Sequence, residues 1–145
     1  MYRLVEILLV EDSLTERYLT LAAIHEAEMT NVIHCVADGV EAMAFLHKEG
    51  KYVDAKRPCL ILLDLNMPRL DGRAVLKLIK ADPSLRSIPI IILTTSSSPL
   101  DIADAYDNSA NGYMAKPLDF KKFCKEMKTL KEFWFQVALL PKEGM

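Results

Sequence analysis

Three carboxylates stand directly after apolar segments of the sequence, where they could bind a metal ion together. They are Glu11, Asp12 and Asp64. If the apolar segments 4–10 and 59–63 are parallel strands, their carboxyl ends meet at one edge of a sheet. Carboxylates gathered there resist joint ionisation, and Mg²⁺ relieves that repulsion while leaving places for phosphate oxygens. The pattern therefore predicts a Mg²⁺ site completed by the carbonyl of Asn66, with Asp64 as a nucleophile toward a phosphoryl group.

Two further polar residues follow apolar segments and have the chemistry to assist phosphoryl transfer. Thr94 follows the run 89–93, and Lys116 follows the short run 112–115. Phosphoryl transfer depends mainly on alignment and on neutralising the charge of the phosphoryl oxygens. Lys116 would be a mobile countercharge to Asp64 and to these oxygens. The Thr94 hydroxyl would donate a hydrogen bond to another phosphoryl oxygen.

The elements that must position these residues alternate along the chain between strand and helix patterns. Short apolar runs predict strands at 4–10, 31–36, 59–63, 89–93 and 112–115. Helices are predicted after each of them, ending near Glu28, Gly50, Asp82, Asp107 and, for the last, within 133–137. Solidly apolar strands alternating with helices indicate a doubly wound α/β domain, with a parallel sheet and helices on both faces.

Two helix starts carry side-chain signatures. Ser13 with Glu16 three residues later predicts a capping box, in which the Glu16 side chain reaches back to the backbone. Asp38 with Glu41 is a second N-terminal signal of the same spacing.

The composition is that of an ordinary globular domain. The chain has 145 residues, of which 51% are hydrophobic and 26% charged, and one core can accommodate it. A net charge of −2 gives no reason to expect nucleic acid or a membrane surface as the main partner. Cys35, Cys59 and Cys124 show no paired spacing and are expected to be reduced thiols. No segment approaches the ~20 apolar residues of a membrane span, and a cytoplasmic location is predicted.

Four motifs, in this order, resemble the receiver domain of two-component response regulators. They are Leu-Leu-Val-Glu-Asp-Ser (8–13), Ile-Leu-Leu-Asp-Leu-Asn-Met-Pro-Arg-Leu-Asp-Gly (61–72), Ile-Leu-Thr-Thr (92–95) and Gly-Tyr-Met-Ala-Lys-Pro (112–117). The resemblance implies a (βα)5 receiver domain at 1–130 with the flavodoxin-like strand order 2-1-3-4-5. Residues 131–145 are then a C-terminal extension that continues the last helix.

The resemblance also implies a role for each site residue. Asp64 would be the phosphoacceptor, supplied by a sensor histidine kinase, and it would bind Mg²⁺ together with Glu11, Asp12 and the Asn66 carbonyl. Lys116 would contact the phosphoryl group, and its bond to Pro117 would be cis. Thr94 and Tyr113 would form a switch that reshapes the face made by the fourth helix, fifth strand and fifth helix. The alternative for Tyr113 is a half-buried strand aromatic without a switching role.

Within this family the chain is similar to the stand-alone regulators of cyanobacterial phytochromes. The similarity lies in the stretches 80–89, 93–96 and 131–141 and in the longer connector 51–57. It implies a phytochrome-type photoreceptor kinase as the partner.

The C-terminal extension is unusually apolar, because Phe133, Trp134 and Phe135 are followed by further apolar residues. A last helix needs only one apolar stripe. We expect either that these aromatic residues pack on their own domain or that they form a homodimer surface, and the second is our hypothesis.

Other functions fit the sequence less well. A phosphatase of the haloacid dehalogenase type places its nucleophile after the first strand, with an acid two residues later, whereas Asn66 is not an acid. A flavodoxin would bind phosphate after the first strand, where Glu11 and Asp12 would repel it. An interaction module that has lost the chemistry usually lacks one of the acidic, threonine or lysine positions, and none of these is missing here. The short segment after residue 130 argues against a DNA-binding domain.

Overall fold

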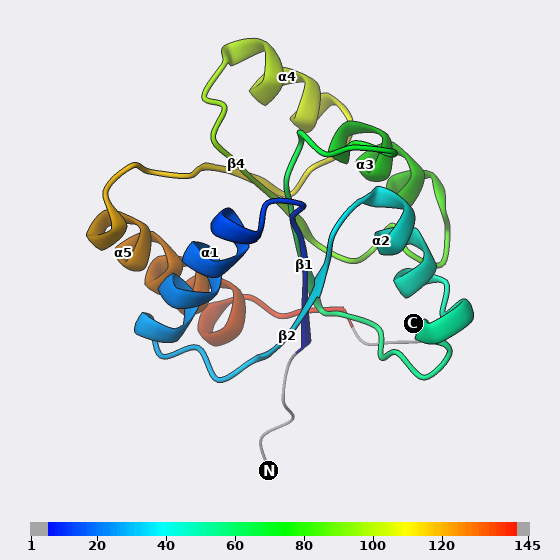
Figure 1. Cartoon of the computed structure of the whole chain (residues 1–145), viewed down its shortest axis with the longest axis horizontal. Coiled ribbons are helices and arrows are strands. Elements are labelled where there is room, and N and C mark those ends of the chain that lie inside the picture. The colour runs from blue at the N-terminus through cyan, green and yellow to red at the C-terminus, as the bar shows by residue number, and fades with distance from the viewer. Residues whose placement is uncertain (1–5, 142–145) are drawn as a thin grey trace.

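The computed structural model describes residues 6–141 and contains one five-stranded parallel sheet (Figure 1). The strand order is β2-β1-β3-β4-β5, and each neighbouring pair is parallel. The strands are β1 (Glu6–Val10), β2 (Val32–Val36), β3 (Leu60–Leu63), β4 (Ile90–Thr94) and β5 (Gly112–Ala115). The predicted doubly wound fold and its strand order are confirmed.

Five α-helices cover the two faces of the sheet. They are α1 (Leu14–Glu26), α2 (Gly39–Leu46), α3 (Gly72–Ala81), α4 (Pro99–Asp107) and α5 (Phe120–Lys131), with a short 3-10 turn η1 (Gly50–Tyr52) after α2. In Figure 1, α1 and α5 lie on one side of the strands, whereas α2 and α3 lie on the other. No helix in the described part of the chain is long and apolar enough to cross a membrane.

The core has two halves because side chains of a strand alternate between its faces. In β3 all four residues are buried. Ile61 and Leu63 pack in the cluster beneath α2, α3 and α4, whereas Leu60 and Leu62 pack in the cluster beneath α1 and α5. An apolar residue at every position of β3 is therefore explained by burial on both faces.

Aspartate or serine side chains cap most of the helices. Asp38 accepts a hydrogen bond from the Glu41 N–H at 2.9 Å, and the Glu41 carboxylate reaches back to the Ala37 N–H at 2.9 Å. Ser13 likewise accepts from the Glu16 N–H at 3.2 Å. The Glu16 carboxylate does not close the predicted capping box, however, because it binds Lys116, and the Ser13 N–H donates to Glu11 instead. A buried ammonium is a stronger partner for a carboxylate than a backbone N–H.

The segment that follows α5 packs against its own domain. After Lys131 the helix widens into a π-helical turn, η2 (Glu132–Val137), which ends when the Ala138 N–H donates to the Phe133 carbonyl at 2.7 Å. Trp134 and Phe135 are half-buried against the core cluster beneath α1 and α5. Phe133 is 52% exposed and stands edge-to-face on Trp134, with ring centroids 5.2 Å apart.

Candidate functional site

The strand order brings the carboxyl ends of β1, β3, β4 and β5 side by side. Val10 of β1 pairs with Leu63 of β3, and the Asp64 N–H donates to the Val10 carbonyl at 3.1 Å. At the end of β4, the Thr94 carbonyl accepts from the Lys116 N–H at 2.6 Å. Backbone hydrogen bonds therefore gather at one edge the polar residues that follow these strands.

The carboxylates of Glu11, Asp12 and Asp64 form a cluster, with an oxygen of each within 4.8 Å of the others. Glu11 and Asp64 are buried, whereas Asp12 is exposed. Burial raises the pKa of Glu11 from 4.5 to about 7, and neighbouring Asp64 adds to this effect, although Lys116 acts in the opposite direction. Carboxylates this close repel one another when ionised, and a divalent cation relieves that repulsion. The oxygen ligands of this cluster fit Mg²⁺.

Asn66 lies two residues beyond Asp64 at the same edge. Its side-chain oxygen accepts a hydrogen bond from Arg73 at 3.3 Å, which ties the loop after β3 to α3. This hydrogen bond involves the side chain of Asn66, whereas the metal-binding role that we predict for Asn66 involves only its backbone carbonyl.

Lys116 is nearly buried, at 6% side-chain exposure, and its ammonium lies between two carboxylates. It donates to Glu11 Oε1 and, at 2.8 Å, to Glu16 Oε2. Burial lowers the pKa of Lys116, but its hydrogen bonds to these two carboxylates outweigh that effect and the pKa is raised. Within residues 6–141, no ion pair joins Lys116 to Asp64, although the charge of Asp64 contributes to the raised pKa of Lys116. Two nearer carboxylates hold the ammonium instead.

Sequence reasoning missed the part that Glu16 plays at this edge. Its spacing from Ser13 fitted a local capping role, and no local signal related it to Lys116, which lies 100 residues away in the sequence. An acidic residue in the first turn of a helix that starts at the site is the only hint that the sequence offers.

Thr94 is completely buried, and its hydroxyl has no hydrogen-bond partner. A buried polar atom without a partner costs roughly 1–3 kcal/mol, so such atoms are rare and often mark a function. This unpaired hydroxyl lies at the end of β4, the strand that pairs with β3 next to Asp64.

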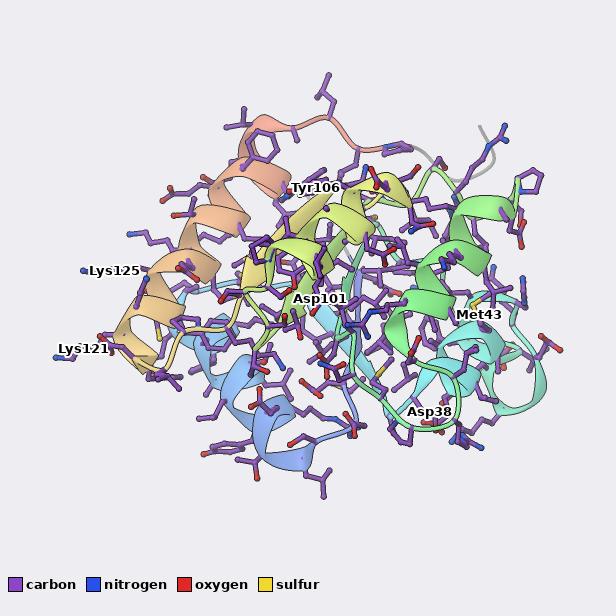
Figure 2. The ribbon with its side chains drawn as sticks, turned by 90° about the horizontal axis from the view of Figure 1, so that it is seen from above. Asp38, Met43, Asp101, Tyr106, Lys121 and Lys125 are labelled. Atoms are coloured by element: carbon purple, nitrogen blue, oxygen red, sulfur yellow. The ribbon has the colours of Figure 1, made fainter. Side chains whose placement is uncertain are left out.

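The loop after Thr94 is hydrogen-bonded to α4 and β5, and α4 is in turn bonded to α3. Ser96 donates from its hydroxyl to Asp101 of α4 at 2.6 Å, and its carbonyl accepts from the Tyr113 hydroxyl of β5 at 3.0 Å. Asp101 also accepts from Arg73 of α3 at 2.8 Å. Figure 2 shows Asp101 on α4, with α3 on one side of that helix and α5 on the other. Tyr113 is thus connected to the loop that follows the buried threonine.

The Lys116–Pro117 bond was expected to be cis, and this expectation is wrong for the structure, in which residues 6–141 contain no cis peptide bond. The expectation came from the family resemblance alone. The trans form of an X–Pro bond is favoured by about 0.5–1 kcal/mol unless surrounding contacts reverse the preference.

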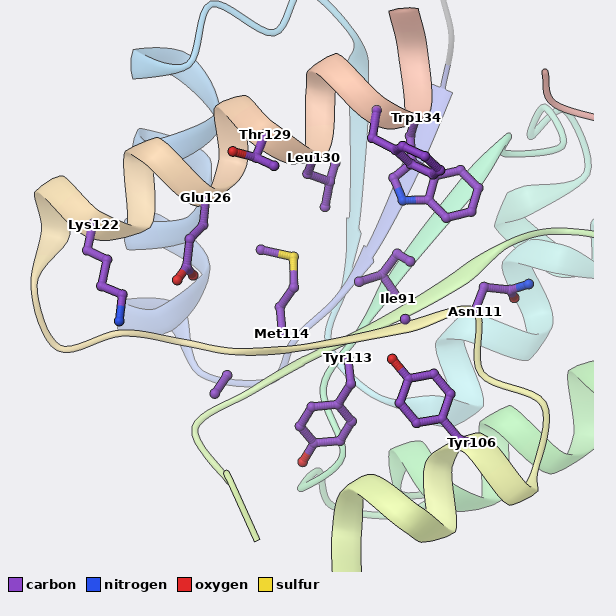
Figure 3. Close-up of a pocket in the computed structure, with 13 residues that line it drawn as sticks. Ile91, Tyr106, Asn111, Tyr113, Met114, Lys122, Glu126, Thr129, Leu130 and Trp134 are labelled. Carbon is purple, nitrogen blue, oxygen red and sulfur yellow. The ribbon is translucent and has the colours of Figure 1, made fainter. Parts of the chain in front are cut away.

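A pocket of about 610 Å³ lies away from the acidic cluster, between α4, β5 and the end of α5. Figure 3 shows Tyr106, Tyr113 and Trp134 around it. Lys122, Glu126 and Phe133 also line this pocket, whereas none of the clustered carboxylates does.

Comparison with known proteins agrees with this geometry. The model of the response regulator receiver domain matches residues 7–128. The chain is 39% identical over 135 residues to the response regulator Rcp1 of Synechocystis sp., covering 93% of this chain and 92% of that protein.

Two solved structures are similar over almost the whole chain. The phosphorylated cyanobacterial phytochrome response regulator RcpA superposes with a TM-score of 0.90 at 41% identity, covering 97% of this chain and 100% of that one. The Mn²⁺-bound form of Rcp1 superposes with a TM-score of 0.86 at 39% identity, covering 94% of this chain and 99% of that one. On its motifs, its strand order and these matches, the chain belongs to the receiver domain family of two-component response regulators.

Proposed function

We propose that Asp64 is the residue on which this response regulator accepts a phosphoryl group, and that Mg²⁺ binds beside it through Glu11, Asp12, Asp64 and the Asn66 carbonyl. The observation that carries the proposal is the carboxylate cluster at the ends of β1 and β3, whose oxygens lie within 4.8 Å of one another. A receiver domain is a phosphoacceptor rather than an enzyme that turns over an external substrate.

In the proposed reaction, an Asp64 carboxylate oxygen attacks the phosphorus atom of a phosphohistidine on a sensor kinase. A new oxygen–phosphorus bond forms, the phosphorus–nitrogen bond breaks, and the imidazole takes the electron pair. Mg²⁺ held by Glu11, Asp12, Asp64 and the Asn66 carbonyl would supply positive charge to neutralise the phosphoryl oxygens. Thr94 donates its unpaired hydroxyl to one of these oxygens, and Lys116 provides a positive charge close to the group. Water later hydrolyses the aspartyl phosphate slowly.

Tyr113 is proposed to report the state of the site. Its hydroxyl holds the Ser96 carbonyl, two residues beyond Thr94, so movement of Thr94 toward a phosphoryl group would pull on the same loop. The surface of α4, β5 and α5 would then change, and a partner would read the change. The half-buried position of Tyr113 is also compatible with a purely structural role.

The proposed kinase partner is a phytochrome-type sensor, and the proposed location of this response regulator is the cytoplasm. Similarity at 39–41% identity to Rcp1 and to the phytochrome response regulator RcpA supports this assignment.

The function is tested by the intact mass of the protein after incubation with acetyl phosphate. We expect one added phosphoryl group, and only when Mg²⁺ is present. A chain that gains no mass from acetyl phosphate or from a kinase, and that does not bind beryllofluoride, would instead be a receiver-like interaction module.

The metal assignment predicts that Asp12→Ala weakens Mg²⁺ binding by roughly tenfold to a hundredfold, as loss of groups around a metal commonly does. The side chain of Asp12 is exposed, so its truncation leaves no cavity in the core. Isothermal titration with Mg²⁺ measures the change. Asp54→Ala is the matched control, because Asp54 is an exposed aspartate in the connector after η1. Equal Mg²⁺ affinity of Asp12→Ala and wild type would remove Asp12 from the site.

We also propose that Phe133, Trp134 and Phe135 contribute to a homodimer surface. The supporting observation is that Phe133 is 52% exposed next to the pocket between α4, β5 and α5. Sedimentation velocity should show association that rises with concentration and is weakened by Phe133→Ser. A monomeric profile at all concentrations, with and without phosphorylation, would contradict this surface.

A further inference from the structure

We propose that Glu16 is a positioning residue that retains Lys116 in the unphosphorylated protein and so limits how readily this lysine engages a phosphoryl group on Asp64. The inference rests on the proposed function and deepens it, because it names a residue that would regulate the same site. It follows from where the structure places the ammonium group of Lys116.

The lysine ammonium is held from two directions. Glu11 comes from the end of β1, and Glu16 comes from the first turn of α1, with its Oε2 atom 2.8 Å from Nζ of Lys116. Side-chain exposure is 6% for Lys116 and 35% for Glu16. The pair with Glu16 is therefore the more exposed of the two contacts that this nearly buried lysine makes.

The two carboxylates differ in what else they can do. Glu11 belongs to the oxygen cluster with Asp12 and Asp64, and its second oxygen already accepts from the Ser13 N–H at 3.3 Å. Glu16 lies outside that cluster, and Lys116 is the only hydrogen-bonding partner that the described residues give its carboxylate. Retaining Lys116 is thus a role that Glu16 can have without also binding metal.

A phosphoryl group on Asp64 would compete with Glu16 for the same ammonium. Lys116 has three N–H donors, and two of them are engaged by carboxylates. No ion pair joins Lys116 to Asp64 among residues 6–141, so in this proposal the ammonium shifts toward the phosphoryl oxygen, and the shift weakens one of its two present contacts. The contact with the more exposed Glu16 is the easier one to release.

Beryllofluoride, which mimics a phosphoryl group on a carboxylate, is the probe for this competition. In Mg²⁺-saturated protein, we expect Glu16→Gln to bind beryllofluoride about twofold to fivefold more tightly than wild type, the range for a partly exposed ion pair. Glu26→Gln is the control, because it makes the same charge change at the exposed far end of α1 and should leave the affinity unchanged. Thermal unfolding would check that both variants are folded.

A double-mutant cycle separates a contact with Lys116 from a general effect of charge. The gain from Glu16→Gln should disappear when it is made in Lys116→Ala. In metal-free protein, Glu16→Gln should also raise the rate at which an amine reagent labels Lys116, measured by mass spectrometry. This second readout needs neither metal nor phosphoryl chemistry.

Each outcome bears on the inference. It is overturned if wild type binds beryllofluoride and Glu16→Gln binds it equally or more weakly. It is also overturned if the gain persists in Lys116→Ala or appears in Glu26→Gln, since the effect would then come from charge alone. If wild type itself does not bind beryllofluoride, the proposed function fails. If wild type binds it but Glu16→Gln shows no gain, only the inference about Glu16 fails.

Discussion

Asp64→Asn should abolish the uptake of a phosphoryl group from acetyl phosphate or from a kinase. An amide has nearly the shape of a carboxylate, but it lacks the anionic oxygen that attacks phosphorus. Asp64 is 9% exposed at the end of β3, so the replacement fits the same space. The measurement is intact mass after incubation with the donor and Mg²⁺, under conditions in which wild type gains one phosphoryl group.

The matched control for this variant lies in the same loop. Asp71→Asn also exchanges a carboxylate for an amide, and Asp71 caps α3 by accepting a hydrogen bond from the Ala74 N–H at 3.0 Å. Asparagine is an equally good N-cap, so this control should stay folded and take up phosphate. A phosphoryl group retained by Asp64→Asn would show that another residue is the acceptor.

Asp64→Asn also tests the repulsion between the clustered carboxylates. Proximity to Asp64 contributes to the raised pKa of Glu11. Without metal, Asp64→Asn should therefore be at least as stable as wild type in urea, because one member of a repelling group has been neutralised. A marked loss of stability would mean that the Asp64 carboxylate has a structural partner of its own.

Gly72→Ala should both destabilise the fold and impair phosphoryl uptake. A Cβ atom at position 72 would lie 1.9 Å from the Asp64 carbonyl oxygen and 2.8 Å from Leu65 Cα. These are backbone atoms, so no side-chain rotation relieves the overlap, and the Gly72 N–H is itself bonded to the Leu65 carbonyl at 2.9 Å. We expect a loss of about 2 kcal/mol or more in the free energy of unfolding. Uptake should fall because the backbone that must move carries Asp64.

Gly50→Ala is the control for this prediction. Its Cβ would meet nothing within 4 Å, although the backbone has a φ of +57°. The left-handed conformation alone should cost about 1–2 kcal/mol. Urea denaturation should therefore separate the two variants only modestly, whereas phosphoryl uptake should remain normal in Gly50→Ala alone. Normal phosphoryl uptake by Gly72→Ala would show that the loop after β3 can change its backbone conformation without displacing Asp64.

The fold and the gathering of three carboxylates at one edge of the sheet could be predicted from the sequence. A run such as Leu60–Leu63 is apolar at every position, which indicates a strand covered on both faces. Once the strands are placed, the residues that follow them must share one edge, because parallel strands all end on the same side. Glu11, Asp12 and Asp64 were identified in this way, and the structure brings their oxygens together.

The partners of individual side chains could not be predicted in this way. Ser13 and Glu16 have the spacing of a capping box, yet the structure pairs Glu16 with Lys116 and leaves only half of the box. Residue spacing predicts contacts within one helix, whereas the competing ammonium belongs to Lys116, which follows β5. A charged partner that is nearly buried then outweighs a local backbone N–H.

The C-terminal extension and the loop after Asp64 also have features that the sequence did not predict. The apolar character of residues 133–135 was evident, but only tertiary packing decided that Trp134 and Phe135 lie against the core beneath α1 and α5 while Phe133 stays half exposed. The close approach of Gly72 to the Asp64 carbonyl was likewise absent from any sequence pattern. Local periodicity determines which segments are strands and helices, because it reflects burial of one face. Contacts between residues far apart in the chain depend on how those elements meet, and they decided the charge balance around Lys116.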